Sequence, residues 1–214
     1  MLSKNPKIHD TDPLLVEMPM PIITPRLLIR PAQSGDGQAL AEAKQASWPE
    51  LQKWMEWAND DTQLTEEKSE IFCRQKQADF ILRQDIHLNV FDHAQSRIVA
   101  STGLHDIDWK GRVFHTGYWV RSDETGKGYA TELTNAMIRY AFGALAANRV
   151  YIGHFEGNEA SQRVIEKLGF EKEGVTKNSS VLNGELMTSV HYGRYDADNL
   201  PDLDVRWEEL GQGT

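Results

Sequence analysis

The residues best suited to chemistry form a glycine-rich turn, RSDETGKGYATEL at residues 121–133. Lys127 lies between Gly126 and Gly128, and a run of helix-forming residues follows. Unpaired N–H groups in the first turn of a helix can point at an anion where glycine leaves no Cβ in the way, and the helix dipole favours negative charge there. The turn therefore predicts a site for a pyrophosphate, to which Lys127 adds a positive charge.

Two other phosphate-binding motifs fit the same turn less well. A dinucleotide-binding fingerprint needs a third glycine where Thr131 stands, although Glu156 after the next strand matches its ribose-binding acid. A Walker-type loop needs Ser or Thr after Gly-Lys, and this chain has Gly128 there. A tight strand-to-helix turn without a ligand stays open as a structural alternative.

The spacing of apolar residues predicts helices and strands on both sides of this turn. We expect helices at 32–48, 48–57, 64–84, 128–144 and 158–168, and strands at 26–31, 86–92, 97–108, 113–120, 149–155 and in two segments joined by Asn183-Gly184. Asn158 is the expected N-cap of the last helix, and Gly169 its C′ residue. Because strand, turn, helix and strand follow one another, residues 113–155 predict a right-handed parallel crossover.

Length and composition are those of one globular domain with extensions. Of the 214 residues, 40% are hydrophobic and 26% are charged, which is ordinary globular usage rather than that of a disordered chain. We expect an irregular arm at residues 1–23, the folded domain at 24–194 and an acidic, irregular tail at 195–214. The chain has neither a signal-peptide pattern nor an apolar run long enough to cross a bilayer, so we expect a cytoplasmic protein without a membrane partner.

Charge and cysteine content argue against several classes of function. The single cysteine, Cys73, rules out an intramolecular disulfide framework, and no His/Cys cluster has the spacing of a zinc site, so no metal is expected. The net charge of −9 argues against a nucleic-acid binder, which needs a basic surface. The same charge suits a cationic or amine-bearing partner, or simply keeps the protein soluble.

Two motifs, GKGYATEL at 126–133 and NEASQRVIEKLGF at 158–170, together resemble the Gcn5-related N-acetyltransferase (GNAT) superfamily. Thr125, Gly128 and Ala130 occupy the three defined places of the superfamily's turn, and Thr125 departs from the usual Gln or Arg. The segments TPRLLIRP, LQKWMEW and GYWVRSDETGKGYATEL add a similarity to the ribosomal-protein serine and alanine N-terminal acetyltransferases. This similarity extends over residues 24–194.

The resemblance implies a GNAT fold, an α+β architecture with a mixed, mostly antiparallel sheet of about seven strands flanked by helices. A central parallel strand pair is splayed in that fold to hold acetyl-CoA, the expected co-substrate. The implied activity is N-acetylation of the terminal α-amine of a protein, such as a ribosomal protein, or of a small amine such as an antibiotic. Homodimers are common among similar proteins. A CoA-binding module without catalysis and a nucleotide-dependent oxidoreductase remain alternative interpretations.

The same resemblance assigns residues to the cofactor. The main-chain N–H that binds the thioester oxygen is expected at Trp119 or Val120, at the end of the strand before the turn. Such an oxyanion donor contributes about 2.7 to 4 kcal/mol to catalysis. The remaining expected cofactor-binding residues are Thr125, Gly126, Lys127, Gly128, Tyr129, Ala130, Thr131, Asn158 and Ser161.

Proton transfer requires an acid for the leaving thiolate and, in many cases, a base for the amine. Many relatives have a tyrosine that acts as the general acid at the position of Ile165, and isoleucine cannot donate a proton. The resemblance to the ribosomal-protein branch offers Ser161 as the acid instead. Ser161 equally fits a role in the first turn of the helix. Glu156 is the preferred base, with His105, Asp106 or an ordered water as alternatives. A terminal amine has a pKa of about 7.7 to 8.0, so a strong base is not compulsory.

The acceptor pocket is expected between the tryptophan-rich segment 48–57 and the hairpin VLNGELM at 181–187. The segment's indoles equally predict a short amphipathic helix packed into the core. Glu50 or Glu56 could attract a cationic acceptor. The expected acceptor-binding residues are Trp48, Trp54, Trp57 and His105.

Overall fold

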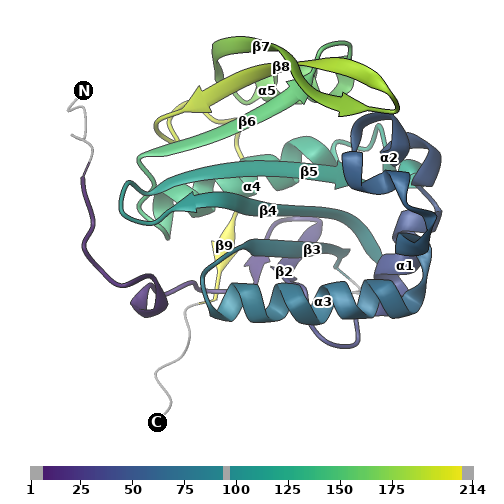
Figure 1. Ribbon diagram of the computed structural model, residues 1–214. Helices are drawn as coiled ribbons and strands as arrows, with labels where there is room; N and C mark the ends of the chain where they lie inside the picture. Colours follow the sequence, from purple (N-terminus) through teal and green to yellow (C-terminus); the bar gives the residue numbers. More distant parts are fainter. Residues whose placement is uncertain (1–6, 94–96, 209–214) are drawn as a thin grey trace.

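The computed structural model describes residues 7–93 and 97–208, so the expectations for residues 1–6 and 209–214 lie outside it. In the described part of the chain, one sheet of nine strands in the order β7-β8-β6-β5-β4-β3-β2-β1-β9 is flanked by five α-helices (Figure 1). The pair β5 and β6 is parallel and the other pairs are antiparallel. The predicted α+β architecture is therefore confirmed.

The helices and strands lie close to the predicted segments. The strands are β1 (Ile22–Ile23), β2 (Leu27–Pro31), β3 (Ile86–Asp92), β4 (Ile98–Asp108), β5 (Val113–Val120), β6 (Arg149–Phe155), β7 (Glu171–Leu182), β8 (Glu185–Arg194) and β9 (Arg206–Trp207). The helices are α1 (Gly37–Gln45), α2 (Trp48–Trp54), α3 (Glu66–Ile81), α4 (Tyr129–Gly143) and α5 (Glu159–Lys167). None of the helices in the described ranges has the length and apolar character that crossing a bilayer requires.

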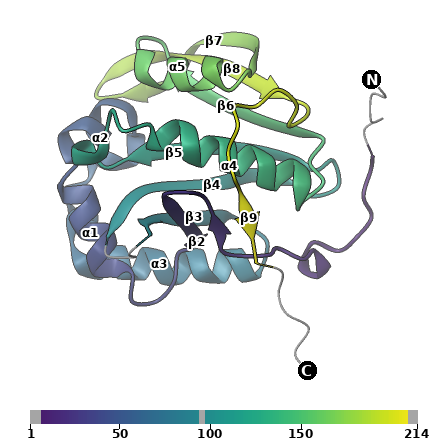
Figure 2. The same ribbon diagram turned by 180° about the vertical axis from the view of Figure 1, so that it is seen from behind.

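The helices cover both faces of the sheet. Figure 2 shows α4 and α5 on one face, and Figure 1 shows α1, α2 and α3 on the other. On the first face, α4 buries Leu133, Met137 and Tyr140 in one cluster with Leu104 and Phe114 of the sheet. Because apolar residues three or four apart share one side of a helix, the predicted periodicity produces this packing directly.

The parallel pair separates soon after it forms. Only Val113, Phe114 and His115 of β5 pair with β6, opposite Arg149, Val150 and Tyr151. Beyond these residues β5 stays paired with β4 as far as Val120, and β6 stays paired with β8 as far as Phe155. Each strand is thus held by its outer neighbour while the two inner edges diverge, which confirms the expected splay.

The segment after residue 194 contributes to the fold, in contrast to the irregular tail that we expected. Its strand β9 pairs with β1, and these two short strands bring the sheet from the expected seven strands to nine. Residues 201–208 alternate between half-buried and exposed, with Leu203, Val205 and Trp207 on the inner side. The Trp207 indole packs edge-on against Tyr140 of α4 with 5.6 Å between ring centroids. The tail therefore stabilises the back of the domain.

Replacing Trp207 by Ala should lower the free energy of unfolding by about 2 kcal/mol, since it leaves a gap beside α4 where the half-buried indole packs. Urea unfolding measures this change. Arg206→Ala is the matched control, because this neighbouring side chain is exposed and its loss should change stability by less than about 0.5 kcal/mol. Equal stability of the two variants would contradict a structural role for β9.

Candidate active site

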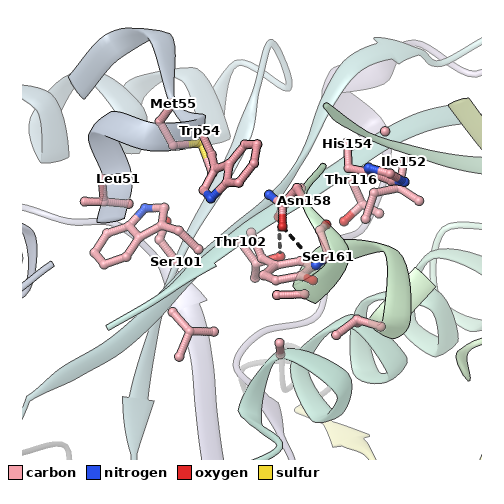
Figure 3. Close-up of a pocket in the computed structure, with 18 of the residues that line it drawn as sticks. Leu51, Trp54, Met55, Ser101, Thr102, Thr116, Ile152, His154, Asn158 and Ser161 are labelled. Carbon is pink, nitrogen blue, oxygen red and sulfur yellow. Dashed lines mark hydrogen bonds between the residues drawn. The ribbon is translucent and has the colours of Figure 1, made fainter. Parts of the chain in front are cut away.

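A cavity of about 1540 Å³ extends across the splay of β5 and β6. It begins at the glycine turn before α4, passes between the separated strands and ends under α2 and α3, where histidine side chains line it. Figure 3 shows Trp54 at the end of α2 and the adjoining Met55 over this space, opposite Asn158, the N-cap of α5, and Ser161. The cavity therefore joins most of the residues that the sequence singled out.

The glycine turn leaves the first amides of α4 open to the cavity. Gly126 and Gly128 have φ angles of +76° and +83°, the left-handed region that glycine adopts without strain. Gly128 is the N-cap of this 15-residue helix, and no side chain caps it. A Cβ at Gly126 would meet nothing within 4 Å. The helix N-terminus thus has both the free donors and the dipole that an anion requires.

The side-chain cations near this turn are already paired. Lys127 Nζ donates to Glu124 Oε2 at 2.8 Å, and Glu124 also pairs with Arg97. Arg26 pairs with the buried Glu132 of α4 at 2.5 Å, donates to the Lys127 carbonyl at 2.8 Å and lies over the Tyr129 ring, 4.5 Å from its centroid. The sequence did not single out Arg26, and no local signal could have done so because it lies about a hundred residues from the turn. Main-chain amides are therefore the main free donors for an anion.

Backbone direction separates the two expected oxyanion donors. The Arg121 amide donates to Val99 of β4 at 2.9 Å, and alternate amides of a strand point the same way. The Trp119 amide, in register with Ser101, therefore points toward β4 and away from the splay. The amides of Tyr118 and Val120 point toward the splay. This geometry corrects the expectation for Trp119 and favours Val120 or Tyr118.

The start of α5 meets the inner edge of β5 inside the cavity. Asn158 Oδ1 accepts from the Ser161 amide at 3.1 Å, which confirms the predicted cap (Figure 3). Burial raises the pKa of Tyr118, while a hydrogen bond with Ser161 opposes this rise. Ile165, the residue in the place of the usual tyrosine, is fully buried. The sequence did not single out Tyr118, whose hydroxyl on β5 is hydrogen-bonded to Ser161 of α5.

The expected cofactor-binding residues occupy one end of the cavity. Its lining includes Val120, Thr125, Gly126, Gly128, Tyr129, Ala130, Thr131, Asn158 and Ser161. Lys127 is not among the lining residues, consistent with its pairing to Glu124. The fold therefore gathers a set that the sequence separates by about thirty residues.

The expected acceptor residues divide into two groups. Trp54, Trp57 and His105 line the cavity. Trp48 does not, because it is buried and its Nε1 donates to Asp61 at 2.7 Å. Its surroundings are those of a core residue rather than of a binding residue.

Glu156, the preferred base, lies outside the cavity lining. Its side chain is exposed where β6 leads into α5, and its amide donates to the Thr188 carbonyl at 2.9 Å. A carboxylate in this position does not face the space between the strands. The position of Glu156 directly after β6 did not show whether its side chain faces the cavity, because side chains of successive residues in an extended chain point in opposite directions.

The hairpin of β7 and β8 reaches the tryptophan-rich segment, as expected. Asn183 and Gly184 have φ angles of +52° and +82°, which fits the predicted tight turn. Asn183 Nδ2 donates to the Gln52 carbonyl of α2 at 2.9 Å. This bond joins the hairpin tip to α2, but residues 181–187 are not among those that line the cavity, to which β8 contributes Ser189 and His191 instead.

A row of histidines crosses the acceptor end on the face of the sheet under α3. His87 of β3, His105 of β4 and His115 of β5 have ring centroids about 6 Å apart, at 6.3 and 6.2 Å. His115 then stacks on Tyr151 of β6 at 4.9 Å. His105 and His115 are register partners, as are His115 and Tyr151, so the row follows from strand pairing.

Hydrogen bonds with Asp85 and Ser101 hold two of these imidazole rings in place. His105 Nδ1 lies 2.5 Å from Asp85 Oδ1, and Ser101 Oγ lies 3.0 Å from His87 Nε2. Burial and the neighbouring His105 lower the pKa of His87 to about 3. Burial by itself raises the pKa of Asp85. The hydrogen bond and charge of His105, together with the Lys76 ammonium, lower it by more, so that the pKa of Asp85 is about 2. At neutral pH this end holds an ionised carboxylate against one imidazole and a neutral imidazole beside it.

The sequence did not single out Asp85, His87 or His115. The alternation of His87 and His115 with apolar neighbours was the available signal, but it could not show that the two strands lie side by side. No group of three or more His, Cys, Asp or Glu side chains in the described residues has the arrangement of a metal site. Imidazole side chains also accept protons and form hydrogen bonds, and the geometry of the row suits both roles.

Residues 26–171 match the acetyltransferase (GNAT) domain family. The chain is 28% identical over 173 residues to the "Putative ribosomal N-acetyltransferase YdaF" of Bacillus subtilis, covering 79% of this chain and 91% of that protein. It is 25% identical over 100 residues to the ribosomal protein uS5-alanine N-acetyltransferase of Escherichia coli, covering 46% of this chain and 52% of that protein.

Among solved structures, Mycobacterium smegmatis RimJ in complex with CoA-disulfide has the same fold, with a TM-score of 0.77 and 20% identity over 88% of this chain and 91% of that one. The splayed strand pair, the glycine turn and the match over more than half of the chain agree with one another. The chain belongs to the acetyltransferase (GNAT) family and is an N-acetyltransferase.

Proposed function

We propose that this enzyme transfers the acetyl group of acetyl-CoA to the N-terminal α-amine of a protein, of the kind that ribosomal proteins present. The observation that carries the proposal is one continuous cavity with an anion-binding helix N-terminus at one end and an aromatic, histidine-lined space at the other. The names of two relatives, which refer to ribosomal N-acetylation, support the acceptor class. Small amines, including antibiotics, are the alternative acceptors.

The chain's residues would hold the two ends of acetyl-CoA by different means. The amides from Gly126 to Thr131 would bind the pyrophosphate, because the nearby Arg26 is already paired with Glu132 of α4. The unpaired edge of β5 at Tyr118 and Val120 would bind the pantetheine as an added strand does. Asn158 would contribute its side chain while it caps α5. Positioning of this kind can lower a reaction barrier by about 7 to 11 kcal/mol.

The same edge would serve the chemistry. The Val120 or Tyr118 amide would donate to the thioester oxygen as negative charge develops there. The Tyr118 hydroxyl, directly or through Ser161, would give its proton to the departing thiolate. A tyrosine hydroxyl is protonated at neutral pH, and burial, which raises the pKa of Tyr118, keeps this proton available for the thiolate.

The expected activity is release of free CoA when acetyl-CoA and a peptide with a free N-terminus are mixed with the enzyme. A thiol-reactive dye measures this release, and mass spectrometry locates the acetyl group. A panel of ribosomal-protein N-terminal peptides is compared with the same peptides blocked at the α-amine, which should give no product. Acetylation of small amines alone would favour the alternative acceptor, and CoA binding without any transfer would contradict the proposal.

Gly128→Ala should weaken acetyl-CoA binding by at least about tenfold, whereas Lys127→Met should weaken it by less than about threefold. A residue other than glycine is strained at φ +83°, which costs about 1 kcal/mol or more before any contact with the ligand. Lys127 is already paired with Glu124, so its loss removes little free charge. Titration calorimetry measures both affinities. The reverse order would show that side-chain charge, rather than main-chain amides, holds the pyrophosphate.

Tyr118→Phe should lower kcat by about a hundredfold while the acetyl-CoA Kd stays unchanged. Activity that depends on the protonated Tyr118 is present at neutral pH and is lost as pH rises through its raised pKa, so the variant should lack this alkaline decline. Ser161→Ala is the paired variant and should have a smaller effect if Ser161 only relays the proton. A large loss in Ser161→Ala with normal turnover in Tyr118→Phe would assign the acid to Ser161 instead.

A further inference from the structure

We propose that His105 is the general base that takes the proton from the acceptor amine, and that Asp85 is the residue that positions it. This inference rests on the proposed function, because it assigns a role at the acceptor end of the same cavity. It replaces Glu156, whose exposed side chain lies outside the cavity lining.

The contact with Asp85 determines which nitrogen of His105 is available. Asp85 Oδ1 lies 2.5 Å from Nδ1, and the second carboxylate oxygen accepts from Lys76 Nζ at 3.0 Å. An ionised carboxylate can only accept hydrogen bonds, so Nδ1 carries the proton of the neutral ring. Nε2 is then the unprotonated nitrogen. A carboxylate in this position also stabilises the imidazolium that forms when Nε2 takes a proton.

The free nitrogen faces a part of the sheet without side chains. A Cβ on Gly103 would lie 2.7 Å from His105 Nε2, so the imidazole lies directly over that glycine. Gly103 is in register with Gly117 of β5, where a Cβ would meet nothing within 4 Å. Gly117 and Gly153 each lie two residues beyond the last paired residues of the splay, His115 and Tyr151. We refer to Gly103, Gly117 and Gly153 as the glycine floor.

The glycine floor connects the base with the reaction centre. Its three residues come from adjacent strands and occupy the same face as the histidine row, since side chains two apart share a face. The floor crosses the sheet where β5 and β6 separate, which is the place proposed for the thioester. An amine that lies on the glycine floor would have His105 Nε2 on one side and the proposed thioester position, between the two strands, on the other.

The neighbouring ionisable groups fit the base less well. His87 has its Nε2 bonded to Ser101, and its buried ring is neutral with a pKa of about 3. Burial and the nearby His105 lower the pKa of His115, whose Nδ1 lies 3.7 Å from Asp106. The groups that face His105 and its row are Lys44 on α1, Lys76 on α3, Asp85 just before β3, His87 on β3, Asp106 on β4, His115 on β5, Tyr151 on β6 and His191 on β8.

The proposed step conserves atoms and charge. The neutral amine nitrogen forms a bond to the thioester carbonyl carbon, and one of its two protons passes to His105 Nε2. The carbon–sulfur bond breaks, and the thiolate takes a proton from the hydroxyl of Tyr118 or Ser161. His105 then returns its proton to solvent, from which the hydroxyl is reprotonated, so the products are the amide and free CoA.

His105→Gln should lower kcat by about a hundredfold or more at pH 7, with an unchanged acetyl-CoA Kd. Asp85→Asn should lower kcat less and should move the acidic limb of its pH profile to lower pH, because the imidazolium loses the carboxylate that stabilises it. His9→Gln, in the N-terminal segment and outside the cavity lining, is the matched control and should keep wild-type rates. Gly117→Ala should raise the acceptor KM, since it adds a methyl group to the glycine floor.

A spectroscopic readout tests the geometry without substrate. In the free wild-type enzyme, nitrogen NMR of labelled histidine should find the neutral ring of His105 protonated at Nδ1, and Asp85→Asn should weaken this preference. His105→Gln that folds normally yet keeps its rate within threefold of wild type across the pH range would overturn the inference. The wild-type assay separates the two proposals, because absence of transfer to any amine defeats the proposed function, whereas normal transfer by His105→Gln defeats only this one.

Discussion

The separation of β5 from β6 is the feature on which the rest of the site depends. Both strands lie in the middle of a nine-stranded sheet, yet they pair over only three residues. Buried backbone N–H and C=O groups need partners, so an inner edge without a neighbouring strand must be open to water or to a ligand. The outer neighbours β4 and β8 hold the two strands in place, so the edge stays open without loss of the sheet.

The same separation determines where the other functional groups lie. Strand β5 leads directly through the glycine turn into α4, so the free edge and the uncapped helix N-terminus form one continuous surface. On the other inner edge, β6 leads into α5, which carries Asn158 and Ser161 back toward β5. The two faces of the splay thus differ: hydroxyl groups and apolar residues lie beside α4 and α5, and the histidine row and the glycine floor lie beside α2 and α3.

The charged groups also differ between the glycine turn and the acceptor end of the cavity. Near the turn, Lys127 and Arg97 are paired with Glu124, so main-chain dipoles rather than side-chain charges remain free for an anion. At the acceptor end, burial keeps His87 neutral, whereas the ionised Asp85 contacts His105 alone among the imidazoles of the row. The protein's net charge of −9 says nothing about either arrangement, because both depend on groups a few ångströms apart.

The sequence by itself determined the features that depend on neighbouring residues. The turn at Gly126 and Gly128, the Asn158 cap and the Asn183-Gly184 hairpin each need only a few consecutive residues of the right type, and all three are present. The alternation at Leu203, Val205 and Trp207 was also readable and was missed because charged residues, Asp204 and Arg206, separate them. The tertiary structure decided what depends on strand register and direction. It turned the Trp119 amide away from the splay, placed Trp48 in the core and left Glu156 outside the cavity, while residues from β3, β4, β5 and β6 formed one row. Such contacts join positions far apart in the chain, and no local pattern encodes which strands become neighbours.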